Sequence, residues 1–193
     1  LPEELHHIVK ENTAFRSEAK QRELQHRIDA LRTVSLFAEL SDEERQTVAE
    51  HMVYAPFVNG GLLTRQGAIA HWLYIIISGK AEVIKELPHG GTQSLAMLEA
   101  GDVFGEMGLL TGEPRTATVV ARSDVECYRL DKSGFEEILQ NRPAIAEAMS
   151  QVLVKRMQQN EETQRHQNKS NGSDSATVAQ AIFSKIRTFF NLK

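Results

Sequence analysis

The sequence predicts an α+β protein in which an antiparallel β-roll or jelly-roll barrel is flanked by N-terminal helices and a C-terminal helix. Short runs rich in β-branched and aromatic residues recur at near-regular spacing between about residues 53 and 131. Helical periodicity occupies both flanks of that region. The chain has 193 residues, of which 41% are hydrophobic, so it can bury one compact core and carry attachments.

Residues 1–32 form a predicted helical connector arm. Leu24, Ile28 and Leu31 recur at the spacing of one helix face. Residues 16–23 carry almost no apolar side chain, and a helix that polar cannot pack tightly along its length. We therefore expect this part of the arm to be exposed.

A second N-terminal helix is expected to begin at Ser41. Serine is a favoured N-cap residue, and Glu44, three residues later, completes the pattern of a capping box. Val48 and Met52 continue the apolar face of this helix.

The central region changes to the pattern of short strands separated by turns that contain Gly, Asn or Asp. Many short strands at near-regular spacing are typical of a closed or nearly closed antiparallel barrel. The predicted strands are Val53–Val58, Leu62–Arg65, Leu73–Ile77, Ala81–Lys85, Ser94–Leu98, Thr118–Ala121 and Glu126–Leu130.

The C-terminal part returns to helix. A helix is predicted over Lys132–Leu139 and another over about residues 143–166, because proline at its start suits the first helical position. Residues 167–175 have the composition of a flexible linker. Residues 176–193 form a short, basic, amphipathic tail, which could lie on a membrane surface or dock on a neighbouring subunit or on its own domain.

The most informative stretch begins at Gly105. Glycines at 105 and 108 let backbone amides approach a ligand closely, at the start of a short helix that favours an anion. Arg115, positioned by Pro114, presents a planar guanidinium suited to one phosphate group. Glu106 beside such an anion indicates that the ligand also offers hydroxyl donors, as a ribose does.

These residues resemble the phosphate-binding cassette of cyclic nucleotide-binding domains. The match consists of residues 104–106, Phe-Gly-Glu, followed by residues 114–118, Pro-Arg-Thr-Ala-Thr. Flanking motifs over residues 36–40 and 73–79 follow the order of the family. The resemblance covers about residues 34–157 and implies a β-roll domain of the type found in catabolite activators and kinase regulatory subunits.

The resemblance also implies a role for each residue of the cassette. Arg115 would pair with the cyclic phosphate, and Glu106 would accept a hydrogen bond from the ribose 2′-hydroxyl. The amides of Gly105, Met107 and Gly108 would line the phosphate and the ribose. The complete expected site consists of Val103, Phe104, Gly105, Glu106, Met107, Gly108, Arg115, Thr116, Ala117, Leu153 and Arg156.

Two of these expected site residues come from a lid helix, residues 143–166, that would close a domain of residues 33–166 over the purine. Leu153 belongs to the apolar face of the lid helix, together with Met149 and Met157. Arg156 would stack on the base by a cation–π contact, although a solvated helix charge is an equal alternative.

The base end of the expected site is less specific. Val103 and Phe104 would lie nearer the base, as would the strand that includes Val83 and Ile84. Thr116 after the arginine resembles family members that accept cGMP, but cAMP-preferring channels also carry threonine there. The base preference therefore stays open at this point.

The sequence departs from the family pattern at a few positions. Gly108 stands where the family usually has Ala or Ser, which keeps the backbone amide. Gly61, Ala68 and His71 replace acids that are common in the family, in turns that we expect to lie away from the ligand.

Composition excludes several functional classes. A net charge of −4 argues against a chain that coats nucleic acid. The longest apolar run, Trp72–Ile77, is far too short to cross a bilayer. The single cysteine, Cys127, allows no internal disulfide and favours a reducing setting. The 7 histidines are scattered and no nucleophile motif occurs, so we expect neither a metal site nor enzymatic activity.

The resemblance implies a sensor that binds a cyclic purine mononucleotide as its regulatory ligand, with cAMP favoured and cGMP acceptable. Lid closure would then signal to an effector N-terminal to the first residue, in a homo-oligomer. The layout favours a membrane ion channel of the small-conductance mechanosensitive type, with this part in the cytoplasm. The alternatives are a cAMP-responsive transcription regulator without its DNA-binding domain and the regulatory module of an upstream enzyme.

Overall fold

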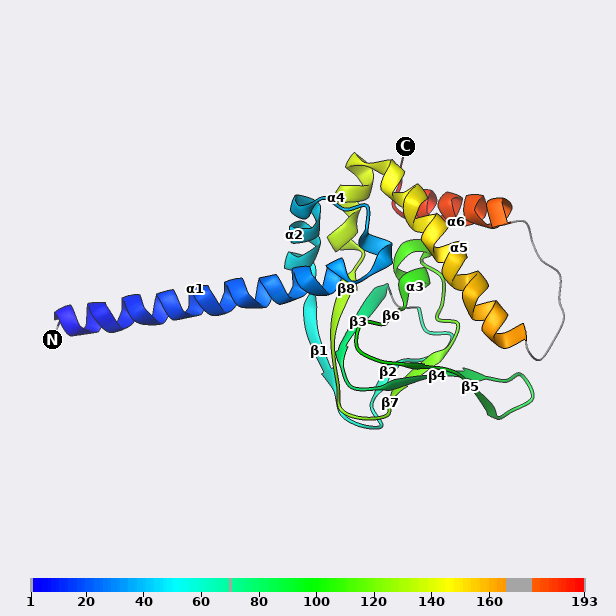
Figure 1. The fold of residues 1–193 in the computed structure, drawn as a ribbon, viewed down its shortest axis with the longest axis horizontal. Coiled ribbons are helices and arrows are strands. Elements are labelled where there is room, and N and C mark those ends of the chain that lie inside the picture. Colours follow the sequence, from blue (N-terminus) through cyan, green and yellow to red (C-terminus); the bar gives the residue numbers. More distant parts are fainter. Residues whose placement is uncertain (1, 70, 166–174, 193) are drawn as a thin grey trace.

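The computed structural model describes residues 2–69, 71–165 and 175–192; within these ranges the side chains of residues 2–11, 156, 159–165 and 175 lie outside the description. Figure 1 shows a β-roll with helices gathered over one end and a long N-terminal helix that extends away from it. The helices are α1 (Pro2–Arg32), the 3-10 helix η1 (Ser35–Phe37), α2 (Asp42–His51), α3 (Glu106–Thr111), α4 (Ser133–Asn141), α5 (Pro143–Arg165) and α6 (Ser175–Phe189).

The roll consists of two four-stranded antiparallel sheets. Their strand orders are β1-β8-β3-β6 and β2-β7-β4-β5. The strands are β1 (Val53–Phe57), β2 (Leu62–Thr64), β3 (Trp72–Ser78), β4 (Ala81–Glu86), β5 (Thr92–Leu98), β6 (Val103–Phe104), β7 (Thr118–Ala121) and β8 (Val125–Asp131). The α+β class and the antiparallel roll that the sequence predicts are therefore confirmed.

Each predicted strand exists with its bounds shifted by no more than two residues, and β6 is the additional one. A strand of two residues is too short to show alternation in the sequence. It is fixed by pairing, since Phe104 lies opposite Tyr74 and Val103 lies opposite Ile75 in β3. This pairing brings the start of the predicted phosphate cassette into the sheet.

The N-terminal helix α1 is exposed for most of its described length and anchored at its end. Phe15 is 66% exposed, whereas Leu31 is fully buried, and Leu24 and Ile28 pack half-buried against the same core. The Tyr128 hydroxyl of β8 donates a hydrogen bond of 3.1 Å to Glu23. The arm therefore leaves the domain beyond Glu23, as its polar sequence predicts.

The capping box at the start of α2 is confirmed by both of its hydrogen bonds. The Glu44 amide donates to Ser41 Oγ at 3.2 Å, and the Ser41 amide donates to the Glu44 carboxylate at 2.8 Å. These bonds satisfy two backbone donors that the helix itself leaves unpaired.

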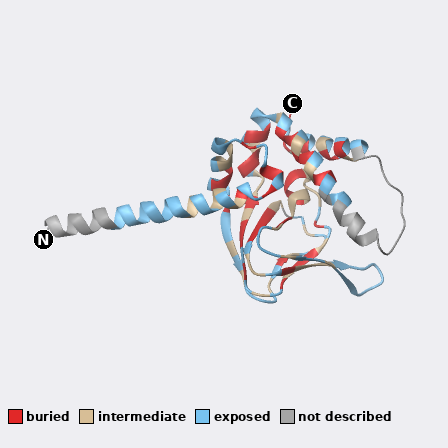
Figure 2. Ribbon diagram, in the orientation of Figure 1, coloured by how far each residue is buried: buried red, intermediate tan, exposed pale blue. Residues whose placement is uncertain are grey.

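The buried side chains form two clusters. Figure 2 shows where buried residues lie along the helices and strands. The larger one joins the helices to β3 and β8, and it includes Phe37, Phe135 and Leu139. The smaller one fills the roll between the two sheets, and it includes Leu63, Ile76, Phe104, Val119 and Cys127. The roll and its helical cover are thus held by separate cores that meet at β3.

We predict that Cys127 reacts with thiol reagents only when the roll opens. Its side chain is fully buried, and burial raises the pKa of the thiol to about 12. The reactive thiolate is therefore scarce in the folded state at pH 8, whereas the unfolded thiol has a pKa of about 8.5. Labelling with a chromogenic disulfide should be slow in buffer and complete in urea.

The same shift has a consequence for stability against pH. The folded pKa of the thiol lies above its unfolded pKa. The contribution of the buried thiol to the free energy of unfolding is therefore fully present below pH ~8.5 and declines as the pH rises above that value. Rapid labelling of the folded protein at pH 8 would contradict the buried placement of Cys127.

Candidate functional site

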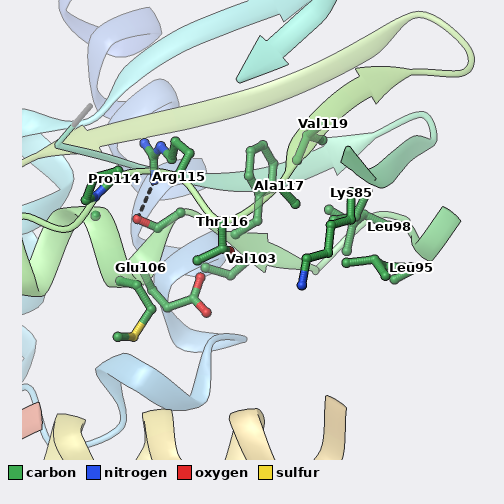
Figure 3. A pocket seen from close by; sticks show the side chains of 16 residues that line it. Lys85, Leu95, Leu98, Val103, Glu106, Pro114, Arg115, Thr116, Ala117 and Val119 are labelled. Carbon is green, nitrogen blue, oxygen red and sulfur yellow. Dashed lines mark hydrogen bonds between the residues drawn. The ribbon is translucent and has the colours of Figure 1, made fainter. Parts of the chain in front are cut away.

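A cavity of about 510 Å³ lies between β4 and β5 on one side and the segment from β6 through α3 to β7 on the other. Figure 3 shows the side chains that surround it. The lining residues are Val83, Lys85, Leu95, Ala96, Leu98, residues 103–108, residues 114–117 and Val119.

The turn between β6 and α3 depends on a glycine. Gly105 has φ +84°, a left-handed conformation that side chains rarely adopt. A Cβ atom on Gly105 would lie 2.4 Å from Arg115 Nη1 and 2.6 Å from the Trp72 carbonyl oxygen. Any other residue here would therefore displace the arginine as well as strain the backbone.

Arg115 closes the same end of the cavity. Its Nη1 donates to the Gly105 carbonyl at 2.7 Å, and its Nη2 donates to the Trp72 carbonyl at 2.5 Å. Its Nε is buried and has no hydrogen-bond partner in the described part of the chain. A guanidinium carries five N–H donors, so these two bonds leave three of them for another acceptor.

The charge of Arg115 is not neutralised by an ion pair among the described residues. Only 6% of the residue is exposed. Burial lowers the pKa of the guanidinium, while the neighbouring Tyr74 and Glu106 act in the opposite direction. Since arginine stays charged in proteins, the site holds a buried cation that lacks a bonded counter-ion. An anion bound there would compensate that charge.

Most of the predicted site residues come together in this cavity. Nine of the expected residues line it: Val103, Phe104, Gly105, Glu106, Met107, Gly108, Arg115, Thr116 and Ala117. The short helix expected after Gly105 is α3, which begins at Glu106.

The two site residues predicted from the lid helix are not among the described residues that line the cavity. Leu153 of α5 does not line the cavity; it is 1% exposed and belongs to the helical core, as does Met149. The apolar face of α5 is thus buried by neighbouring helices, whereas Met157 is 38% exposed. The side chain of Arg156 lies outside the described residues.

At the other end of the cavity the sequence reasoning anticipated Val83 but missed Lys85, Leu95 and Leu98. Val83 and Lys85 of β4 both line it, whereas Ile84, expected near the base, does not. Successive residues of a strand point to opposite faces, so the alternation along β4 could have identified Lys85. Leu95 and Leu98 of β5 complete this end.

The comparison with known families agrees with this geometry. Residues 55–142 match the family model described as "Cyclic nucleotide-binding domain". This segment, a little under half of the chain, is similar to that family. The matched part of the chain includes every predicted cassette residue from Val103 to Ala117.

Several known proteins are similar to the domain. A cAMP-dependent protein kinase regulatory subunit from Blastocladiella emersonii is 35% identical over 109 residues, which cover 56% of this chain and 27% of the relative. A second such regulatory subunit, from Dictyostelium discoideum, is 35% identical over 119 residues, which cover 61% of this chain and 36% of the relative. The chain therefore spans about a quarter to a third of the length of these relatives.

Solved structures share the fold. The regulatory subunit of a cAMP-independent protein kinase A from Trypanosoma cruzi, bound to guanosine, is 29% identical with a TM-score of 0.56, covering 61% of this chain and 42% of its own. The regulatory domain of Toxoplasma gondii protein kinase A, solved with cAMP, has a TM-score of 0.64 at 24% identity and covers 74% of this chain and 52% of its own. At that identity the second likeness concerns the fold alone.

In this domain the C-terminal helix α6 packs directly against the cassette. A Cβ atom on Gly112, which ends α3, would lie 2.7 Å from the Phe189 ring. The Lys185 ammonium forms an ion pair with Glu113, two residues before Arg115. Lys132 donates a hydrogen bond of 2.7 Å to the Phe189 carbonyl. Three alternatives were open for the tail, and α6 follows the one in which the tail docks on its own domain.

His71 lies where α6 and the cassette meet, although its sequence position suggested a turn away from the ligand. Its Nδ1 is 3.2 Å from the Gly108 carbonyl oxygen. Its ring lies 5.1 Å from the Phe189 ring, measured between centroids. The residue that replaces a common family acid thus contacts the back of the cassette and the C-terminal helix together.

We predict that Phe189→Ala lowers the free energy of unfolding by about 2 kcal/mol, since truncating a fully buried Phe costs ~3–5 kcal/mol and this one is half-buried. The lost contacts of the ring are those with Gly112, His71, Lys132 and Phe190. Urea unfolding measures the change. The exposed neighbour substitution Thr188→Ala should stay within about 0.5 kcal/mol of wild type. Equal stabilities of the two variants would argue against docking of α6.

Proposed function

We propose that this chain is a regulatory module that binds a cyclic purine mononucleotide in the cavity beside Arg115. The observation that carries the proposal is the buried guanidinium, which has no bonded counter-ion and an unpaired Nε within the part of the chain that the structure describes. A buried unpaired charge is costly, and a phosphate offers several acceptor oxygens in the geometry of the guanidinium fork. Binding of a cyclic phosphate would offset that cost.

The other cassette residues suit the remaining parts of such a ligand. Glu106, at the start of α3, would accept a hydrogen bond from the ribose 2′-hydroxyl. The amides of Gly105, Met107 and Gly108 would face the phosphate and the ribose, with Thr116 and Ala117 beside them. The purine would then lie toward β4 and β5, where most lining residues are apolar.

Signalling would be a shift between two arrangements of α5. Among the residues of α5 whose side chains the structure describes, none lines the cavity. A bound purine would favour an arrangement in which part of α5, with Arg156 as a candidate, covers the base. A ligand shifts such an equilibrium only by its difference in affinity for the two arrangements.

For the effector, the relatives favour the regulatory module of an enzyme over the expected channel. Both curated relatives are described as cAMP-dependent protein kinase regulatory subunits, and their names give no support to a channel. Among the described residues no helix is both long and apolar enough to cross a bilayer. A non-catalytic role and a cytoplasmic location are part of this proposal.

The first test is substitution of Arg115. We expect Arg115→Ala to weaken binding of cAMP and cGMP at least 100-fold, because removing one partner of a buried charge pair costs ~3–5 kcal/mol. The affinity of Arg115→Lys should lie between those of the wild type and of Arg115→Ala, since lysine keeps the charge and loses the planar fork. Isothermal titration calorimetry measures all three proteins, and thermal unfolding checks that each is folded.

The matched control is Arg122→Ala, which removes an arginine paired with Glu82 at 2.6 Å on the roll surface. It should bind as wild type does. Equal affinity of the wild type and of Arg115→Ala would refute the role of Arg115.

A second test uses the cassette glycine. Gly105→Ala should abolish nucleotide binding, because the new methyl group would lie only 2.4 Å from Arg115 Nη1 and would displace it. Gly101→Ala is the control: Gly101 also has a positive φ, +92°, but nothing lies within 4 Å of its Cβ position. If both variants lost the same affinity, backbone strain rather than displacement of Arg115 would be the cause.

A further inference from the structure

The base end of the cavity contains one charged side chain. Val83, Leu95, Ala96, Leu98 and Val119 make this end apolar, and Lys85 extends into it from β4. Figure 3 shows the Lys85 side chain reaching into the cavity, with Arg115 and Glu106 toward its other side. The cavity therefore presents a cation at each end.

The ammonium of Lys85 has no ion-pair or hydrogen-bond partner among the described residues. Two cations next to the strands of the same sheet are paired: Lys80, just before β4, lies 3.0 Å from Glu99, and Arg122, just after β7, lies 2.6 Å from Glu82. Lys85 shares a face of β4 with Val83, which lines the cavity as well. Its position in the strand thus directs three free donors toward the space that a base would occupy.

We propose that Lys85 makes the site select guanine over adenine. This inference rests on the proposed function, because it concerns the base of the same nucleotide. An ammonium donates hydrogen bonds and accepts none. Guanine presents two acceptors, N7 and O6, on one edge, whereas adenine presents N7 beside a donating amino group. The adenine amino group and the Lys85 ammonium are both hydrogen-bond donors, so they would form no hydrogen bond with each other.

The rest of the site has less power to make this distinction. Arg115 and Glu106 would bind the phosphate and the ribose, which are identical in cGMP and cAMP. The apolar residues of β4 and β5 contact either purine equally well, since they offer no hydrogen bond. Besides Thr116, whose side chain also lines the cavity, the difference between the two nucleotides therefore falls on Lys85.

The test compares cGMP, cIMP and cAMP by calorimetry on the full chain. Inosine keeps the N7 and O6 acceptors of guanine and lacks its 2-amino group. We expect the wild type to bind cGMP and cIMP about tenfold more tightly than cAMP, within the range of one good base-edge contact. Lys85→Met should remove that preference by weakening cGMP and cIMP and leaving cAMP within about twofold.

The matched control is Lys80→Met, which removes the same charge from the residue before β4, at a position that does not line the cavity. It should keep the preference, which separates a base contact from general attraction of an anionic ligand. A wild type that prefers cAMP, a Lys85→Met variant that weakens all three nucleotides equally, or cIMP that binds as weakly as cAMP would each overturn the role of Lys85. If the wild type bound none of the three nucleotides, that result would instead overturn the proposed function.

Discussion

The two hydrogen bonds from Arg115 to the carbonyls of Gly105 and Trp72 hold together the beginning of β3, the turn into α3 and the approach to β7. These segments lie far apart in the sequence, and a single guanidinium joins them from inside the protein. The requirement for glycine at 105 follows from this contact, because the arginine occupies the space of a side chain. The position of Glu106 at the cavity follows in turn. The site is therefore organised around a charge whose Nε finds no hydrogen-bond partner among the residues that the structure describes.

The helix α3 contacts both the cavity and the helical core. Its first residues line the cavity, while Leu109 and Leu110 are fully buried in the helical core. Its end rests on the Phe189 ring of α6, and the ion pair between Glu113 and Lys185 holds the loop that follows. A displacement of α3 at the cavity would therefore have to be accommodated by α6 as well. In a helix of 6 residues there is little length in which to absorb it.

The sequence was sufficient where the signal is local, and it failed where the answer depends on distant partners. Strand alternation, the capping box at Ser41 and the spacing from Gly105 to Arg115 are short-range patterns with direct physical causes. The apolar stripe of α5 shows that one face is buried, but it cannot tell whether a purine or other helices bury it, and Leu153 is buried in the helical core. The contact of His71 with Phe189 joins positions that no local pattern relates.

The arm α1 gives the domain a mechanical property. From Pro2 to Glu23 the helix extends about 33 Å at a rise of about 1.5 Å per residue. It is held at one end by Leu24, Ile28 and Leu31 and by the hydrogen bond between Glu23 and Tyr128 of β8. A rigid rod fixed in this way is a lever, so a tilt of about 10° at its base displaces the far end by roughly 6 Å, given that length. Rearrangements in the roll that are too small to open a contact would thus be magnified along the arm into a movement as large as one helical turn.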